Sequence, residues 1–157
     1  MRKMYIRLMQ VADVTQILEI EQQVQFHPWT ARQFRDSLDS YQCTVLELDE
    51  QVAGFCIMQP VLDEANLLLM AIAPQQQGKG LGFQLLQDAI ERLGEKCVQI
   101  FLEVRESNQA AIALYEKAGF HQIDMRKHYY PAPNGKKEHA VIMVNMLQAE
   151  NFSFNVV

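Results

Sequence analysis

The chain has 157 residues, 49% hydrophobic and 21% charged, which are the proportions of one globular domain with a buried core. Its formal net charge of −5 disfavours nonspecific nucleic-acid binding and favours neutral or basic partners. The longest uncharged apolar run is too short to span a bilayer, and charges interrupt any signal-peptide core, so we expect no membrane association.

The N-terminal part of the chain predicts a short strand and two helices. Residues 5–8 are typical of a strand, and residues 13–24 carry apolar side chains at helical spacing. Thr30 followed by Gln33 has the pattern of a capping box, which predicts the start of the second helix. Trp29, just before it, fits a plug in the core or the wall of a substrate groove. We favour the core, because a single large aromatic residue usually packs.

The next part predicts a hairpin and a central strand. Residues 43–48 and 52–58 are β-rich runs joined by a short polar turn. Residues 63–66 predict the turn into a strand over residues 67–73. That strand carries no charge, which suits a strand covered on both faces, and Pro74 ends it by removing a backbone donor.

A glycine-rich segment follows the central strand where a helix is expected to begin. Glycines allow a tight turn and let an anion approach bare N–H groups at the positive end of a helix. The spacing fits neither a Walker A loop nor the G-x-G-x-x-G dinucleotide fingerprint. It predicts a phosphate cradle of another kind, although a plain connecting turn remains the alternative. The segment is Gln77, Gly78, Lys79, Gly80, Leu81 and Gly82.

The C-terminal half alternates helices and strands. The predicted elements are a helix over residues 80–93, a strand over 98–104, a helix over 109–117, strands over 120–127 and 138–147, and a turn-rich loop over 129–135. The whole pattern predicts an α/β fold with a mixed central sheet and helices on both faces. We expect a single domain over residues 1–147 and a C-terminal tail over residues 148–157.

The three cysteines, Cys43, Cys56 and Cys97, are far apart and lie in apolar, strand-like surroundings. They are typical of buried free thiols in a reducing cytoplasm. Neither they nor the four histidines have the spacing of metal ligands, so we expect no metal site.

Three segments resemble the GNAT superfamily of N-acetyltransferases. The pattern Gln-x-x-Gly-x-Gly after a strand resembles its pyrophosphate loop. Residues 102–120 closely resemble its segment LEVRxSNxxAxxLYxxxGF. The motif Arg126-x-x-Tyr129-Tyr130-Pro131 resembles a narrower group, the bacterial ribosomal-protein-alanine N-acetyltransferases. The resemblance covers residues 5–147, nearly the whole chain, and implies the GNAT fold and acetyl-coenzyme A (acetyl-CoA) as co-substrate.

The resemblance also implies residue roles. Glu103 falls on the general base of the family and Tyr115 on the general acid that protonates the coenzyme A thiolate. Gln77 takes the place of a more usual arginine, which weakens charge neutralisation at the phosphates, and Lys79 offers compensation. The resemblance also implies which positions bind the cofactor. The strand residues would bind through backbone groups, the loop residues mostly through backbone groups, and Asn108 through its side chain. These positions are Leu69, Met70, Ala71, Gln77, Gly78, Lys79, Gly80, Leu81, Gly82 and Asn108.

Each catalytic candidate also has an ordinary structural interpretation. Glu103 is a strand-end carboxylate that fits an ion pair with Arg105 or Lys96. Tyr115 sits at a helix position that is usually core, and Asn108 is a good helix N-cap, a role compatible with cofactor binding. Tyr129 and Tyr130 fit the mouth of a peptide site or a simple loop anchor equally well. His27 is atypical of the narrower group.

The sequence leads to one main functional hypothesis and two alternatives. The main one is acetyl transfer from acetyl-CoA to the N-terminal alanine of a small-subunit ribosomal protein, by direct attack in a ternary complex. A basic ribosomal peptide suits the acidic chain, and we expect a monomer or a weak homodimer. The alternatives are acetylation of another amine (a lysine, a polyamine or a drug) and a non-catalytic module that binds acetyl-CoA.

Overall fold

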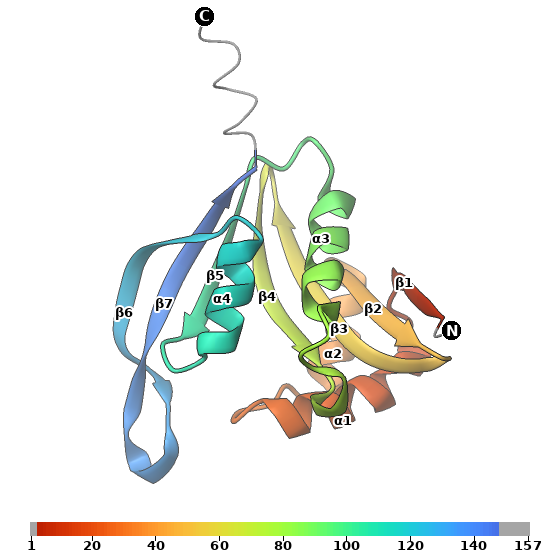
Figure 1. Ribbon diagram of the computed structural model, residues 1–157, viewed down its shortest axis with the longest axis horizontal. Coiled ribbons are helices and arrows are strands. Elements are labelled where there is room, and N and C mark those ends of the chain that lie inside the picture. The colour runs from red at the N-terminus through yellow and green to blue at the C-terminus, as the bar shows by residue number, and fades with distance from the viewer. Residues whose placement is uncertain (1–2, 148–157) are drawn as a thin grey trace, which may run out of the picture. The chain divides into compact units, whose positions relative to one another are not determined.

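The computed structural model describes residues 3–147, and the predicted tail, residues 148–157, lies outside this range. Strand order, by hydrogen bonding, is β1-β2-β3-β4-β5-β7-β6 (Figure 1). The elements are β1 (Met4–Leu8), η1 (Val11–Asp13), α1 (Val14–Val24), α2 (Ala31–Ser40), β2 (Gln42–Leu48), β3 (Gln51–Val61), β4 (Glu64–Ile72), η2 (Pro74–Gln76), α3 (Leu81–Leu93), β5 (Gln99–Arg105), α4 (Gln109–Lys117), β6 (His121–Pro131), η3 (Pro133–Gly135) and β7 (Lys137–Met146). The predicted α/β fold with a mixed sheet is confirmed.

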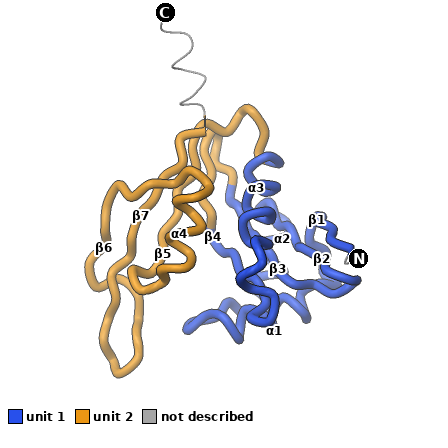
Figure 2. The backbone as a smooth tube through the Cα atoms, viewed as in Figure 1, with its two compact units in different colours: residues 1–59, 68–92 blue, residues 60–67, 93–157 orange. Residues whose placement is uncertain are grey.

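The described chain forms two compact units (Figure 2). The first comprises residues 3–59 and 68–92, and the second comprises residues 60–67 and 93–147. Strand β4 begins in the second unit and ends in the first, so the chain passes between the units within one strand.

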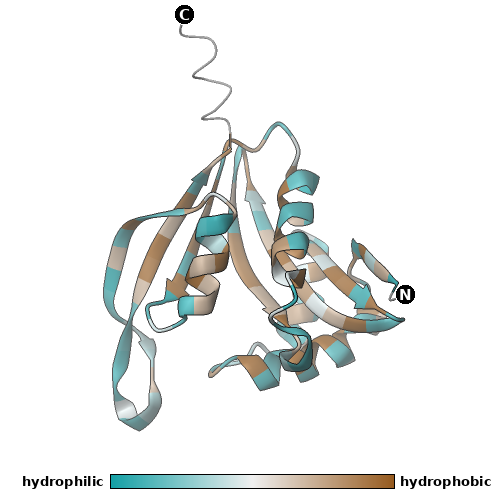
Figure 3. Ribbon diagram, in the orientation of Figure 1, coloured by the Kyte–Doolittle hydropathy of each residue, from teal (hydrophilic) through white to brown (hydrophobic). Residues whose placement is uncertain are grey.

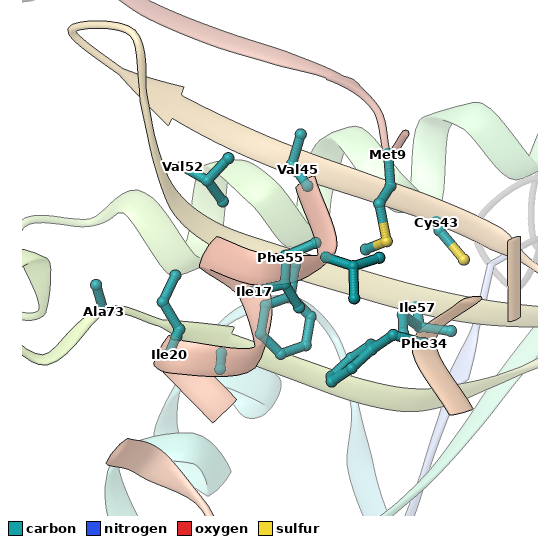
Figure 4. Close-up of a cluster of buried hydrophobic side chains, with 12 residues drawn as sticks. Met9, Ile17, Ile20, Phe34, Cys43, Val45, Val52, Phe55, Ile57 and Ala73 are labelled. Carbon is teal, nitrogen blue, oxygen red and sulfur yellow. The ribbon is translucent and has the colours of Figure 1, made fainter. Parts of the chain in front are cut away.

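One face of the first unit is packed by α1 and α2. Figure 4 shows side chains of both helices meeting those of β2 and β3. Phe34 of α2 and Phe55 of β3 are fully buried, with ring centroids 5.4 Å apart. Trp29 is half-buried and packs on Phe34 at 5.3 Å, which confirms the predicted core plug. The predicted capping box is also present, since the Thr30 hydroxyl accepts the Gln33 N–H and the Gln33 side chain accepts the Thr30 N–H.

The other face of the first unit is packed by α3, as Figure 1 shows. Leu81, Leu85, Leu86 and Ala89 form the buried side of this helix. The Gln42 side-chain amide of β2 donates to the Ala89 carbonyl at 3.0 Å, which ties the helix to the sheet. The prediction of helices on both faces is therefore confirmed in this unit.

The second unit joins a parallel pair to an antiparallel group. β4 runs parallel to β5, β5 pairs antiparallel with β7, and β7 pairs antiparallel with β6. α4 covers one face of β5 and β7, and the Asn145 side chain donates to the Ala118 carbonyl just beyond that helix at 3.1 Å. Figure 3 shows apolar residues concentrated along these strands and polar residues at the tip between β6 and β7.

Two strand boundaries differ from the predictions. Residues 64–66 were predicted as a turn but open β4, because Leu62 and Asp63 alone make the turn and Asn66 pairs with Phe101 in the parallel ladder. The predicted loop over residues 129–135 is shorter, because Tyr130 pairs with Glu138 and thereby extends β6 to Pro131.

Two further expectations concern the cysteines and the helices. Cys43, Cys56 and Cys97 are buried and free, as predicted. Cys97 nevertheless lies before β5 rather than in a strand. Within residues 3–147, no helix combines the length and apolar character needed to cross a bilayer.

A carboxyl group that the sequence analysis did not single out is fully buried in the first unit. Glu21 of α1 has none of its surface exposed. Its Oε2 accepts the Trp29 N–H at 2.9 Å, whereas its Oε1 has no hydrogen-bond partner among the described residues. Burial raises the pKa of Glu21 to about 7, although the Trp29 N–H opposes this shift. Glu21 therefore anchors the turn between α1 and α2 at an electrostatic cost whenever it is ionised.

We predict that Glu21→Gln stabilises the protein increasingly as pH rises. The folded pKa lies above the ordinary value of 4.5, so the folded state holds the proton more tightly and stability falls between pH 4.5 and about 7. Glutamine abolishes this loss, so the variant should gain up to about 3 kcal/mol at pH 8 relative to pH 4.5. Urea unfolding across this range measures the gain, with Glu19→Gln on the exposed side of α1 as control. A gain independent of pH would contradict the prediction.

Candidate functional site

The parallel ladder between β4 and β5 is short. Within residues 3–147 it comprises four pairs, from Glu64 with Gln99 to Leu67 with Leu102, although both strands continue further. Glu103 is therefore the first β5 residue beyond the ladder. The next residues of β4 include the predicted cofactor-binding positions Leu69, Met70 and Ala71. The ladder with β5 does not extend to these residues, so it leaves unpaired the backbone groups that alternate residues of β4 turn to that edge.

The prediction that both faces of β4 are covered is confirmed in part. Ala65, Leu67 and Ala71 are buried, on alternate positions of the strand. Leu69, on the same face, and Leu68, Met70 and Ile72, on the opposite face, are half-buried, and Leu68 and Leu69 pack against the core. Half-buried apolar residues retain some apolar surface for a ligand.

The glycine-rich segment turns through two glycines in the left-handed backbone conformation. Gly78 and Gly80 have φ angles of 78° and 79°, which side chains other than glycine's rarely allow. A Cβ built at either position meets no atom within 4 Å, so the surface above the loop is open. α3 begins at Leu81, and its first turn includes Gly82. Open N–H groups at a helix start favour a phosphate-bearing ligand.

The polar side chains of this loop contact the protein itself. The Gln77 side-chain amide donates to the Ile72 carbonyl at 2.9 Å, which ties the loop to the end of β4. The Lys79 ammonium donates to the Gln76 side chain at 2.9 Å. Gln77 therefore stabilises the loop, and the backbone is left as the main source of donors for a ligand. The predicted role of Lys79 at the phosphates stays a prediction.

Glu103 forms an ion pair, but not with a partner that the sequence analysis considered. Its Oε1 lies 3.3 Å from Nη2 of Arg126 on β6, and its side chain is 31% exposed. Arg105, one of the two expected partners, instead lies 3.5 Å from Glu138 and donates to the Pro131 carbonyl at 2.7 Å. The expected pairing is wrong, because the order β5-β7-β6 brings Arg126 near Glu103 across β7.

Asn108 and Tyr115 lie on α4 as predicted. The Asn108 Oδ1 accepts the Ala111 N–H at 3.2 Å, so Asn108 is the N-cap. Tyr115 is half-buried rather than core, and its ring packs on that of Phe120 with centroids 5.8 Å apart. The predicted role of Tyr115 as the general acid stays a prediction.

The two tyrosines of the β6 motif have different surroundings. Tyr130 is half-buried, and the Arg105 guanidinium lies over its ring at 4.6 Å. Burial raises the pKa of Tyr130 to about 12, and the Glu103 charge adds to the shift. Tyr129 is 47% exposed and lies under the Arg126 guanidinium at 5.1 Å. Tyr130 thus has the environment of an anchor, whereas Tyr129 offers an open aromatic face.

The predicted site residues divide between the two units. The residues of β4 and of the glycine-rich loop lie in the first unit, and Glu103, Asn108 and Tyr115 lie in the second. The structure adds Arg126 to the second group. From the sequence, Arg126 was recognisable only as part of a motif, because its proximity to Glu103 depends on strand order.

Other features of the described residues lie apart from these groups. A cavity of about 410 Å³ in the first unit is lined by α1, the β2–β3 turn and η2, with no predicted site residue among its walls. In the same part of the chain, no cluster of three or more histidine, cysteine, aspartate or glutamate side chains has the arrangement of a metal site.

Comparisons with known proteins find relatives that are similar in sequence and in fold. A sequence profile of the acetyltransferase (GNAT) family matches residues 11–120. The ribosomal protein bS18-alanine N-acetyltransferase of Haemophilus influenzae is 46% identical over 136 residues, which are 85% of this chain and 92% of that protein. Its Salmonella typhimurium counterpart is 40% identical over 140 residues, 88% of this chain and 94% of that one. The crystal structure of the ribosomal-protein-S18-alanine N-acetyltransferase from Escherichia coli superposes with a TM-score of 0.86 at 37% identity, covering 92% of this chain and 94% of that one.

We predict that Asn108 stabilises α4 by capping it. Asn108→Ala removes the acceptor of the Ala111 N–H and should lower the free energy of unfolding by about 1 kcal/mol. Asn108→Ser keeps a capping oxygen and should retain most of the stability. Urea unfolding of the three proteins measures both effects. Equal stability of the alanine and serine variants would show that the cap contributes nothing.

Proposed function

The chain belongs to the acetyltransferase (GNAT) family, and from that premise we propose that it moves the acetyl group of acetyl-CoA to the N-terminal alanine of a small-subunit ribosomal protein. We choose this acceptor because the chain is 46% identical to a bS18-alanine N-acetyltransferase over 85% of its length. The glycine-rich loop and the carboxylate beyond the β4–β5 ladder supply the chemistry that such a transfer needs.

The residues of the first unit fit the binding of acetyl-CoA. We propose that the backbone N–H groups of residues 77–82 bind the pyrophosphate, with the loop geometry supported by the contact from Gln77 to Ile72. The backbones of residues 69–71 bind the acetyl and pantetheine amides, because the ladder with β5 leaves that edge of β4 unused. Asn108 adds a side-chain contact to the cofactor, since its amide group remains available while its oxygen caps α4.

Acetyl transfer requires a neutral amine, a base and an acid. A peptide α-amine has a pKa of about 7.8 and a lysine about 10.4, so deprotonation at pH 7 costs about 1 kcal/mol against about 4.6 kcal/mol. An α-amine therefore demands less of the base. We assign the base to Glu103, acting directly or through a water molecule, and the acid to Tyr115. Glu103 takes one proton from the α-ammonium, and the neutral amine nitrogen then bonds to the acetyl carbon as the carbon–sulfur bond breaks. The Tyr115 hydroxyl protonates the departing thiolate, and the second proton lost by the nitrogen restores that hydroxyl.

Charge and cysteine chemistry suit this proposal. A chain with net charge −5 attracts a basic ribosomal peptide. Three free thiols suit the reducing cytoplasm, where ribosomal proteins are made. A monomer or a weak homodimer remains our expectation for the oligomeric state.

We predict turnover on a free N-terminal alanine. Free-thiol release from acetyl-CoA, together with mass spectrometry of the acceptor, should show acetylation of a peptide that begins Ala-Arg. The same peptide with a blocked N-terminus should stay unmodified, and a panel of polyamines and small amines should react much more slowly. Turnover on small amines alone would retain the acetyltransferase but reject the ribosomal acceptor. Cofactor binding without turnover on any acceptor would favour a binding module.

We also predict that Glu103→Gln and Tyr115→Phe each lower kcat by about 10² to 10⁴, because each removes a proton transfer in the transition state. Glu106→Gln and Tyr5→Phe, which make the same chemical changes at exposed positions, should leave kcat unchanged. Circular dichroism checks that all four variants fold. Full turnover by the folded Glu103 and Tyr115 variants would reject the assigned roles.

A further inference from the structure

Arg126 stands beside the proposed base and has no assigned role in the reaction. Its Nη2 lies 3.3 Å from the Glu103 Oε1, and its guanidinium carbon lies 5.1 Å from the centre of the Tyr129 ring. The Arg126 side chain is 53% exposed and that of Glu103 is 31% exposed, so an incoming molecule can reach both groups. The proposed base therefore forms a solvent-accessible ion pair with a guanidinium that stays positively charged across the working pH range.

The strand register explains why the two side chains meet. Glu103 pairs with Ile142 of β7, and Arg126 pairs with Ala140, two residues along the same strand. Residues directly opposite in an antiparallel ladder point to the same face, so both side chains lie on one face of the sheet in a diagonal relation. Asn145, at an odd-numbered position of β7, instead contacts the chain next to α4. Glu103 and Arg126 thus lie on the face that α4 leaves uncovered.

We propose that Arg126 is a positioning residue for the acceptor amine, acting through Glu103. Before the acceptor binds, Arg126 orients the Glu103 carboxylate. When the α-ammonium arrives, it displaces Arg126 from Glu103, and the guanidinium remains over Tyr129 beside the amine. A like charge nearby favours the neutral amine, which is the form that attacks. This inference rests on the proposed function and on the assignment of Glu103 as base.

The energetics of the pair suit such an exchange. A solvent-accessible ion pair is weak, so an ammonium can replace the guanidinium at little cost. The aromatic face of Tyr129 keeps the displaced guanidinium close through a cation–π contact. Glu103 therefore loses one cation and gains another without a bare carboxylate in between.

The surrounding charges leave Arg126 as the cation that acts on this amine. Arg105 lies 3.5 Å from Glu138, and the two offset each other. The Asp124 carboxylate, also on β6, accepts the Met125 N–H at 2.7 Å. Tyr130 is a neutral phenol near neutral pH, because its pKa is raised to about 12. The charged and titratable groups that neighbour the pair are Arg105 of β5, Asp124, Tyr129 and Tyr130 of β6, and Glu138 of β7.

The test is steady-state kinetics of Arg126→Gln with an alanine-initiated peptide across pH 6 to 9. The variant lets the ammonium pair with Glu103 unopposed, so KM for the peptide should fall a few-fold. The bound amine should then lose its proton less readily, so kcat at pH 7 should fall about tenfold. The acidic limb of the kcat profile should move up by roughly half a pH unit to one unit. Arg126→Lys keeps the charge and should restore most of kcat.

Lys127→Gln is the matched control, because it removes the same charge from the next, exposed residue of β6. It should leave kcat, KM and the pH profile unchanged. Wild-type values in Arg126→Gln, or a raised KM with unchanged kcat and pH profile, would overturn the inference alone. Absence of wild-type turnover on every α-amine would overturn the proposed function and this inference with it.

Discussion

The early end of the parallel ladder between β4 and β5 is the constraint on which the candidate site depends. The two strands pair over four residues each and stop at Leu67 and Leu102. Backbone groups in a strand need partners, so a β4 that continues without this ladder has hydrogen bonds to give to a ligand. Glu103 follows the last paired residue of β5 directly. The interruption thus leaves the later β4 residues outside this ladder and makes Glu103 the first β5 residue beyond it.

The end of β4 sets up the second half of the site. Pro74 follows the strand, and glycines with positive φ then place the chain at the start of α3. The side chain of Gln77 returns to the carbonyl of Ile72, so its amide stabilises the turn instead of neutralising a phosphate. When the side chains of a loop hydrogen-bond within the protein, the groups left to bind an anion are backbone N–H groups and the helix dipole. In the proposed function, these backbone groups take over the phosphate contact that an arginine more usually makes.

Interactions between residues that are close in the sequence made much of this structure predictable. The helix over residues 109–117, its Asn108 cap and the capping box before α2 are present because each depends on neighbours within four residues. The Arg126–Glu103 pair was not predictable, because it depends on β7 lying between β5 and β6. The length of β6 was missed for the same reason, since partners on β7 outweigh the turn signal of the prolines. Glu21 was missed because a carboxylate usually indicates a solvated helix position, although Glu21 lies four residues after Ile17 on the same buried face.

The central claim is that this acetyltransferase modifies an α-amine rather than a side-chain amine. The most direct measurement uses one peptide that carries both a free N-terminal alanine and an internal lysine. The peptide is incubated with acetyl-CoA and the protein, and tandem mass spectrometry then locates the acetyl group. We expect acetylation of the α-nitrogen alone, because deprotonating that amine at Glu103 costs less free energy. Acetylation of the lysine while the α-amine stays free would contradict it.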